Sequence, residues 1–124
     1  MIKKFILIIF TVLLSAPVFA SELEKALAAK QRVFLYLTSD RCGYCVRFNP
    51  IYNKIRQKYG NTYKFIKLDI STQEGYITGK RFDVNYVPYV LVINGENMEG
   101  QQIPTKCLLN YSCAERAINN FFNN

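Results

Sequence analysis

The chain has 124 residues, half of them hydrophobic, and its 16 basic and 9 acidic residues give a net charge of +7. It contains no histidine, which excludes imidazole metal ligands, a histidine general base and a Cys–His nucleophile pair. The basic residues are scattered in runs no longer than two, whereas nucleic-acid binding needs a basic stripe. We therefore expect no nucleic-acid partner.

The first twenty residues have the layout of a secretory signal peptide. A cationic start with Lys3 and Lys4 precedes an uncharged apolar run over 5–15, and Pro17 and small residues lead to Ala20. This pattern predicts export and cleavage after Ala20. A retained membrane anchor is the alternative, but the apolar run is well short of the roughly 20 residues that span a bilayer. No cysteine lies directly after the run to carry a lipid anchor.

Cleavage would leave residues 21–124 as one domain with a modest core. It would also lower the net charge from +7 to +5, because Lys3 and Lys4 are removed. Exported proteins meet an oxidising compartment, in which disulfides persist. The four cysteines form two close pairs, Cys42/Cys45 and Cys107/Cys113.

The first half of this domain predicts the order α, β, α, β. Residues 21–30 are rich in helix formers, with Ser21 as the N-cap, and the apolar, β-branched run 32–38 predicts a buried strand. Apolar residues recur on one face over 45–59, which predicts a helix that Pro50 should kink and Gly60 should end. Residues 62–70 predict a second strand.

The second half predicts α, β, β, α. Residues 72–81 suggest a short helix weakened by two glycines, and 89–93 a third strand. Asn94-Gly95 is a hairpin turn signal, so a fourth strand should follow within 98–106. Ser112 and Glu115 match a capping box for a last helix that ends near 122. The whole indicates an α/β fold, a mixed sheet of about four strands flanked by helices.

The stretch SDRCGYCVRF (39–48) places Cys42 between a strand end and a helix start. Free N–H groups and the dipole at a helix N-terminus stabilise an anion, so Cys42 should be the nucleophile. Cys45, one turn on, is placed to resolve a mixed disulfide. Arg41 favours a Cys42 thiolate, whereas Asp40 opposes it.

Two other interpretations of the CxxC pair remain open. Zinc needs four ligands, and only Cys107 and Cys113 could complete the set, at a spacing wider than a usual zinc half-site. Alternatively, both cysteine pairs are purely structural disulfides. Redox cycling fits an oxidising compartment best, and it needs no metal and no other cofactor in the domain.

These residues resemble exported proteins of thioredoxin fold over nearly all of 21–124. The block RVFLYLTSDRCGYCVRFNPIY is similar to the family's active-site block, and Pro50 lies where the family has its kink proline. The segment FDVNYVPYVLVINGE (82–96) is similar to the family's cis-proline segment. The resemblance implies a thioredoxin-like fold, a cis peptide between Val87 and Pro88, and short β-pairing of an extended client with that loop. Without the resemblance, Pro88 would be an ordinary proline at a strand start.

The sequence also departs from common thioredoxins. Gly43 and Tyr44 make the pair resemble the CGYC site of periplasmic disulfide isomerases of the Dsb group, although their separate dimerisation domain has no room here. We expect both to contact clients, with a helix-capping role for Tyr44 as the alternative. Tyr36 stands where thioredoxins bury an aspartate, so no acid–base residue is assigned. Lys67 falls where the family often has a lysine near the site, or else is a surface residue.

Cys107 and Cys113 close a short loop that common thioredoxins lack. We expect a structural disulfide that pins the last helix and contributes roughly 2–3 kcal/mol at most. The alternatives are a relay pair that exchanges with Cys42/Cys45, free thiols, or bonds between molecules.

The sequence thus predicts an exported thiol–disulfide oxidoreductase, periplasmic by its resemblance, that oxidises, isomerises or reduces disulfides in exported client proteins. Electrons must pass through a redox partner protein, membrane-bound or not. CGYC and the missing aspartate favour an oxidising or isomerising role. The alternative is a chaperone-like client-binding module whose disulfides are structural.

Overall fold

The computed structural model describes residues 21–123, so the predicted signal peptide, 1–20, lies outside the described residues. Every predicted helix and strand is present, in the predicted order. In chain order the elements are α1 (Glu22–Ala28), β1 (Arg32–Thr38), α2 (Gly43–Tyr59), β2 (Lys64–Asp69), α3 (Gln73–Arg81), β3 (Tyr89–Asn94), β4 (Glu99–Gln102), the 3₁₀ turn η1 (Thr105–Cys107) and α4 (Tyr111–Asn123). Within the described range, no helix is long and apolar enough to cross a bilayer.

The strands form one four-stranded mixed sheet in the order β2-β1-β3-β4. β1 is parallel to β2 and antiparallel to β3, and β3 is antiparallel to β4. The predicted mixed sheet is therefore confirmed. The parallel pair is joined through α2, and the antiparallel pair β3–β4 is a hairpin.

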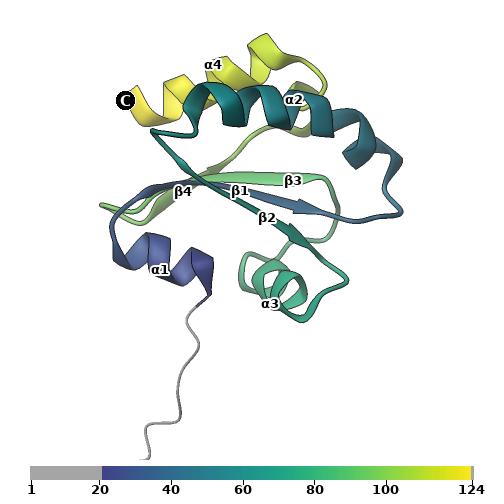
Figure 1. Cartoon of the computed structure of the whole chain (residues 1–124), viewed down its shortest axis with the longest axis horizontal. Coiled ribbons are helices and arrows are strands. Elements are labelled where there is room, and N and C mark those ends of the chain that lie inside the picture. Colours follow the sequence, from purple (N-terminus) through teal and green to yellow (C-terminus); the bar gives the residue numbers. More distant parts are fainter. Residues whose placement is uncertain (1–20, 124) are drawn as a thin grey trace, which may run out of the picture.

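Helices cover both faces of the sheet, with α2 and α4 on one side and α1 and α3 on the other (Figure 1). Successive side chains of a strand point to opposite faces, and β1 divides its residues accordingly. Phe34 and Tyr36 enter the core under α2 and α4, whereas Val33, Leu35 and Leu37 enter the core on the α1 side. β1 therefore has no solvent face.

The predicted β3–β4 hairpin is confirmed, and Asn94-Gly95 lies at its turn. Asn94 pairs with Glu99, so residues 95–98 form a four-residue loop, in which Met98 takes a positive φ of 61°. Gly95 also has a second role. Its N–H donates to the Gln31 carbonyl at 3.0 Å, and a Cβ at this position would collide with that oxygen.

The predicted capping box of the last helix is wrong. Asn110, not Ser112, caps α4, because its Oδ1 accepts a hydrogen bond from the Cys113 N–H at 3.0 Å. Cys113 is disulfide-bonded to the buried Cys107, with their Cα atoms 5.0 Å apart. The start of α4 is therefore fastened to η1.

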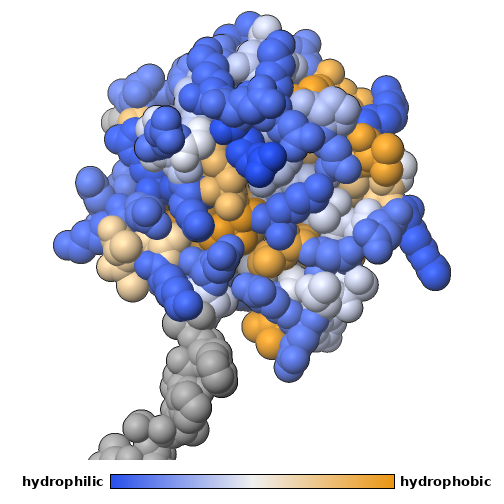
Figure 2. Space-filling model, in the orientation of Figure 1, coloured by the Kyte–Doolittle hydropathy of each residue, from blue (hydrophilic) through white to orange (hydrophobic). Residues whose placement is uncertain are grey.

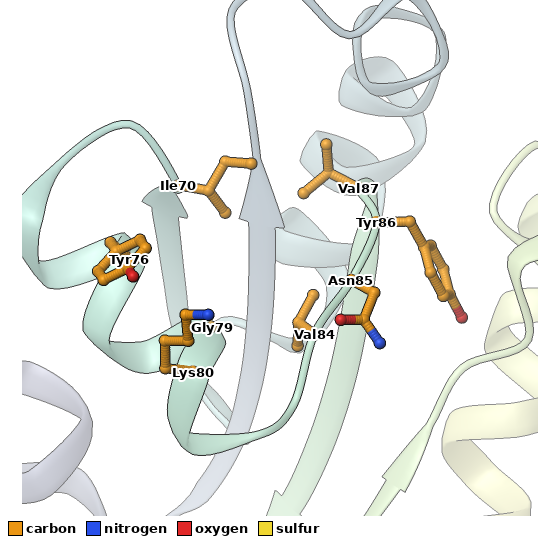
Figure 3. Close-up of a pocket in the computed structure, with 9 residues that line it drawn as sticks. Ile70, Tyr76, Gly79, Lys80, Val84, Asn85, Tyr86 and Val87 are labelled. Atoms are coloured by element: carbon orange, nitrogen blue, oxygen red, sulfur yellow. The ribbon is translucent and has the colours of Figure 1, made fainter.

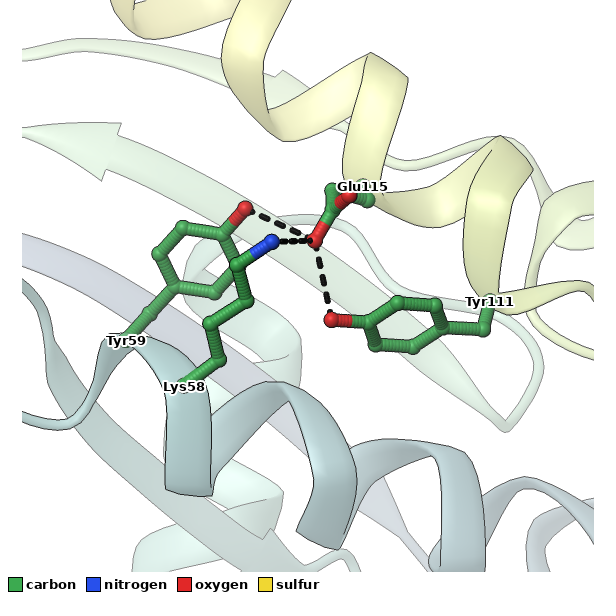
Figure 4. A network of polar contacts seen from close by, with 4 residues as sticks. All are labelled: Lys58, Tyr59, Tyr111 and Glu115. Carbon is green, nitrogen blue, oxygen red and sulfur yellow. Dashed lines mark hydrogen bonds and ion pairs between the residues drawn. The ribbon is translucent and has the colours of Figure 1, made fainter.

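Glu115 connects α4 to the end of α2 instead of capping its own helix (Figure 4). Its Oε2 accepts hydrogen bonds from Lys58 Nζ at 2.6 Å, Tyr111 Oη at 2.8 Å and Tyr59 Oη at 2.9 Å. The hydrogen bond from Lys58, followed by those from Tyr111 and Tyr59, lowers the pKa of Glu115 from 4.5 to about 2.

Replacing Glu115 with glutamine should remove an acid-sensitive part of the stability. Because the folded-state pKa of Glu115 lies below its ordinary value, its contribution is complete above about pH 4.5 and is lost as the pH falls towards 2. Lys58 is largely exposed, so screening by solvent limits the loss to about 1 kcal/mol. Urea unfolding across this pH range measures it, with Glu99→Gln in the exposed β4 as control. Parallel acid profiles for wild type and Glu115→Gln would contradict the assignment.

Candidate active site

Cys42 and Cys45 form a disulfide at the N-terminus of α2. Cys42 is the N-cap residue, and its Sγ accepts a hydrogen bond from the Cys45 N–H at 3.0 Å. The helix is 17 residues long, and its first turn consists of uncharged residues. The positive end of the helix dipole and a free N–H group therefore both act on the Cys42 sulfur, and they would stabilise a thiolate there once the disulfide is reduced.

The two sulfurs differ in access. Cys45 is only 1% exposed, whereas Cys42 is half-buried and follows the exposed residues Asp40 and Arg41. Thiol–disulfide exchange requires an approach to the sulfur under attack. An incoming thiolate can therefore reach Cys42 but not Cys45.

The sheet register brings the Val87–Pro88 loop to the same edge as the cysteines. β1 ends at Thr38, four residues before Cys42, and its ladder with β3 begins with Leu37 opposite Tyr89. The next residues outward on each strand are Thr38 and Pro88. The Val87–Pro88 peptide bond is cis, Pro88 is buried and Val87 is half-buried.

Tyr36 lies beneath the second cysteine, at the position where the resemblance placed a buried aspartate. Its ring is fully buried, and its hydroxyl donates to Asn49 Oδ1 at 3.0 Å and lies 3.3 Å from the Cys45 carbonyl oxygen. Loss of solvation on burial raises the pKa of Tyr36, so this group stays a neutral donor. It holds the first turns of α2 in place and supplies no carboxylate.

Lys67 and Asn49 complete this layer. Lys67 Nζ lies 3.4 Å from Asn49 Oδ1 and 5.5 Å from the centre of the Tyr36 ring, while its side chain remains exposed. Lys67 is thus both a surface residue and a neighbour of the site. Asn49 was missed by the sequence analysis, although its position four residues after Cys45 places both on one helical face.

Tyr44 neither caps the helix nor stands free in solvent. Its ring is half-buried, and its hydroxyl donates to the Thr105 carbonyl in η1 at 3.2 Å. Gly43 beside it is exposed, and a Cβ there would meet no atom within 4 Å. The Gly43-Tyr44 dipeptide between the cysteines therefore has an exposed backbone at Gly43, and Tyr44 links it to the segment of Cys107.

The zinc interpretation requires free cysteine thiolates as ligands. All four cysteines are consumed in two disulfides, so none is a thiolate ligand in this state. Among residues 21–123, no group of three or more histidine, cysteine, aspartate or glutamate side chains gathers closely enough to hold a metal ion.

Comparison with known proteins places this geometry in a family. The thioredoxin family model matches residues 11–107, while no curated protein matches the chain. A chain solved for the thiol resolving mechanism in yeast mitochondrial 1-Cys peroxiredoxin via glutathione/thioredoxin systems is 18% identical, with a TM-score of 0.66 over 82% of this chain and 89% of that one. Oxidised thioredoxin from Plasmodium falciparum is 20% identical, with a TM-score of 0.64 over 82% and 91%. Oxidised mitochondrial thioredoxin 3 from Saccharomyces cerevisiae is 20% identical, with a TM-score of 0.61 over 80% and 87%.

Replacing Tyr36 with phenylalanine should destabilise the oxidised protein by about 1 kcal/mol, because the Cys45 carbonyl and the half-buried Asn49 Oδ1 each lose a hydrogen bond from the Tyr36 hydroxyl. Urea unfolding of the oxidised protein measures this loss. Tyr76→Phe, at a tyrosine that is 58% exposed, should stay within about 0.5 kcal/mol of wild type. Equal effects of the two substitutions would show that the Tyr36 hydroxyl does not anchor α2.

Proposed function

This chain belongs to the thioredoxin family, and we propose that it oxidises or isomerises disulfides in exported client proteins. Its CxxC pair makes it a thiol–disulfide oxidoreductase. The signal-peptide layout of residues 1–20 supports export, and the CGYC resemblance supports the periplasm of a two-membrane bacterium as its location. The contact of Cys42 with the N-terminus of α2 is the observation that carries the oxidising direction.

The proposed reaction passes two electrons from the client to the protein. A client thiolate attacks Cys42 Sγ, the Cys42–Cys45 bond breaks, and Cys45 leaves as a thiolate that takes up a proton. A second client thiolate then attacks the client sulfur of the mixed disulfide, and Cys42 leaves as a thiolate. The client gains a disulfide, and a redox partner protein must reoxidise the Cys42/Cys45 dithiol.

The proposed direction is supported by the state of the couple that the fold stabilises. The Cys45 N–H and the dipole of α2 favour a thiolate on Cys42, and hence the reduced form. A couple whose reduced form is stabilised is a stronger oxidant. Tyr36 adds to this effect, because a neutral phenol beneath Cys45 does not oppose negative charge as a carboxylate would.

Client binding is proposed at the edge that Cys42 shares with Val87. The backbone of Val87 lies outside the β1–β3 ladder, which begins at Tyr89, so an extended client segment can pair with it. Gly43 leaves the approach to Cys42 open. Pro88 and Tyr44 are proposed to contact the client as well, because they are the chain neighbours of Val87 and Gly43.

The reduction potential of Cys42/Cys45 tests the proposed direction. We expect a value between about −120 and −180 mV in glutathione buffers, the range of oxidants and isomerases. Measurement on wild type and on a Cys107→Ser/Cys113→Ser variant separates the two disulfides. Cys42→Ser should form no mixed disulfide and have no turnover. A potential near about −270 mV would make the protein a reductant instead, and a pair that never exchanges with glutathione would exclude the redox function.

Export has its own test. The protein recovered from the periplasmic fraction should begin at Ser21, as measured by mass spectrometry of its N-terminal peptide. Ser21 is then both the first residue and the N-cap of α1, where its Oγ accepts from the Glu24 N–H at 3.1 Å. Recovery of a chain that keeps Met1, or only in the cytoplasm, would contradict the proposed location.

A further inference from the structure

Charge is divided unevenly between the two helical layers of the molecule. The helices on one side of the sheet, α2 and α4, carry five basic residues and one acidic residue, whereas α1 and α3 carry three of each. The five basic side chains are all exposed: Arg47, Lys54, Arg56, Lys58 and Arg116. In Figure 2 the upper part of the molecule, where Figure 1 places α2 and α4, is largely hydrophilic. Most of the net charge of the domain therefore lies in one helical layer.

The layer built by α1 and α3 has a different character. Its pocket of about 440 Å³, between α3 and the loop that leads to the cis peptide, is lined mainly by apolar groups such as Ile70 and Val87 (Figure 3). Both helices also have acidic residues in their first turns: Glu22, Glu24 and Glu74. Acidic residues at this position offset the positive end of a helix dipole. α2 has no acidic residue among its 17 positions, so the positive potential at its start, beside Cys42, is not offset within the helix.

Three of the cations form a basic stripe along α2: Arg47, Lys54 and Lys58. They are seven and four residues apart, a spacing that places them on one face of a helix. Lys54 Nζ lies 4.2 Å from the centre of the Tyr111 ring in α4. Lys58 Nζ lies 2.6 Å from Glu115 Oε2, also in α4. The basic stripe therefore runs along the junction of α2 and α4.

Two cations of the basic stripe pair with no acidic side chain of residues 21–123. Glu115 is the one acidic residue of α2 and α4, and it is bound to Lys58. Arg47 Cζ lies 5.9 Å from the centre of the Tyr44 ring, and Lys54 also lies over a tyrosine ring. A cation over a ring keeps its charge, and the attraction is weak at an exposed site. Arg47 and Lys54 are therefore available to an anion from outside the chain.

The basic stripe begins beside the reactive cysteine. Cys42 is the N-cap of α2, and the exposed Gly43 follows it. Gly43 and Arg47 are four residues apart and so are neighbours on the helix surface. Lys54 lies about 18 Å along the helix from Cys42, at about 1.5 Å per residue, a distance that about six extended residues span. A segment that is joined to Cys42 and passes over Gly43 therefore meets Arg47 first and Lys54 next.

We propose that Arg47 and Lys54 form a docking surface for an acidic segment of the protein that exchanges with Cys42. Such a segment carries aspartate or glutamate within about six residues of its reactive cysteine. Complementary charges speed association, and salt removes the effect by screening them. The occupant is a protein segment because the stripe starts at the residue that a client sulfur must reach. This inference rests on the proposed function and adds the charge of the partner to it.

The test uses the reduced Cys45→Ser protein and peptides whose single cysteine is joined to 2-thiopyridine, an uncharged leaving group. The Cys42 thiolate attacks the peptide sulfur, the bond to 2-thiopyridine breaks, and the released thiolate takes up a proton. Two glutamates are placed about three and six residues from the cysteine, on either side of it in separate peptides, and glutamines replace them in the reference peptides. With glutamates on one side, we expect a rate about tenfold above the glutamine rate at about 0.01 M salt, and equal rates near about 1 M.

Removal of the two cations should abolish this preference. Arg47→Gln/Lys54→Gln, added to Cys45→Ser, should bring the glutamate-to-glutamine rate ratio close to one. Lys25→Gln/Arg81→Gln is the matched control, because it removes one lysine and one arginine that are exposed on α1 and α3 and changes the net charge equally. The ratio should stay at about ten in this control. The unfolding midpoint of each variant verifies that it is folded.

The outcomes separate the docking surface from the redox function. Equal rates for glutamate and glutamine peptides, or equal losses in the two double variants, would overturn the docking surface and leave the redox function intact. Equal peptide rates together with binding to phosphatidylglycerol vesicles that Arg47→Gln/Lys54→Gln abolishes would assign the stripe to a lipid surface instead. No reaction of Cys42 with any peptide, the glutamine peptides included, would overturn the proposed function and the docking surface with it.

Discussion

The burial of β1 on both faces is the constraint on which the rest of the structure depends. Six of its seven residues are buried, and they alternate between the two cores that the helices cover. Neighbouring strands pair with it on both edges, so β1 can shift neither along nor across the sheet. The end of this strand therefore offers a fixed point, from which Cys42, Ile70 and the Val87–Pro88 loop are positioned by backbone register.

Tyr36 connects this strand to the helix that carries the cysteine pair. A residue pointing into the α2 core from the middle of β1 lies beneath the first turns of α2, where a polar tip must find partners because it is fully buried. Tyr36 finds them in Asn49 and Cys45. A carboxylate in this place would exchange protons with the site and oppose charge on the sulfurs. A phenol only holds the helix, so the electrostatics at Cys42 are set by the helix N-terminus.

Local patterns predicted the elements well, because strand and helix periodicity directly reflects which side chains are buried. They failed where a distant partner decided the outcome. Ser112 and Glu115 satisfy the capping-box spacing, but Glu115 is bound by Lys58 and Tyr59, which are 57 and 56 residues away in sequence. Asn94-Gly95 does mark the hairpin turn, but the turn rule does not show that the approach of Gln31 also requires glycine at 95. Asn49 could be assigned to the site only from its contacts with Tyr36 and Lys67 in the structure.

The two glycines of α3 make the same point about local sequence. In the sequence, Gly75 and Gly79 are equivalent, because each weakens a short helix by the same loss of backbone entropy. In the structure only Gly75 is required by packing, because the end of β2 passes too close for a side chain. A Cβ at Gly79 would meet only Leu37 Cδ1, at the ordinary contact distance of 4.0 Å. The two positions differ only in what packs against the helix from elsewhere in the chain, and a local pattern carries no information about that.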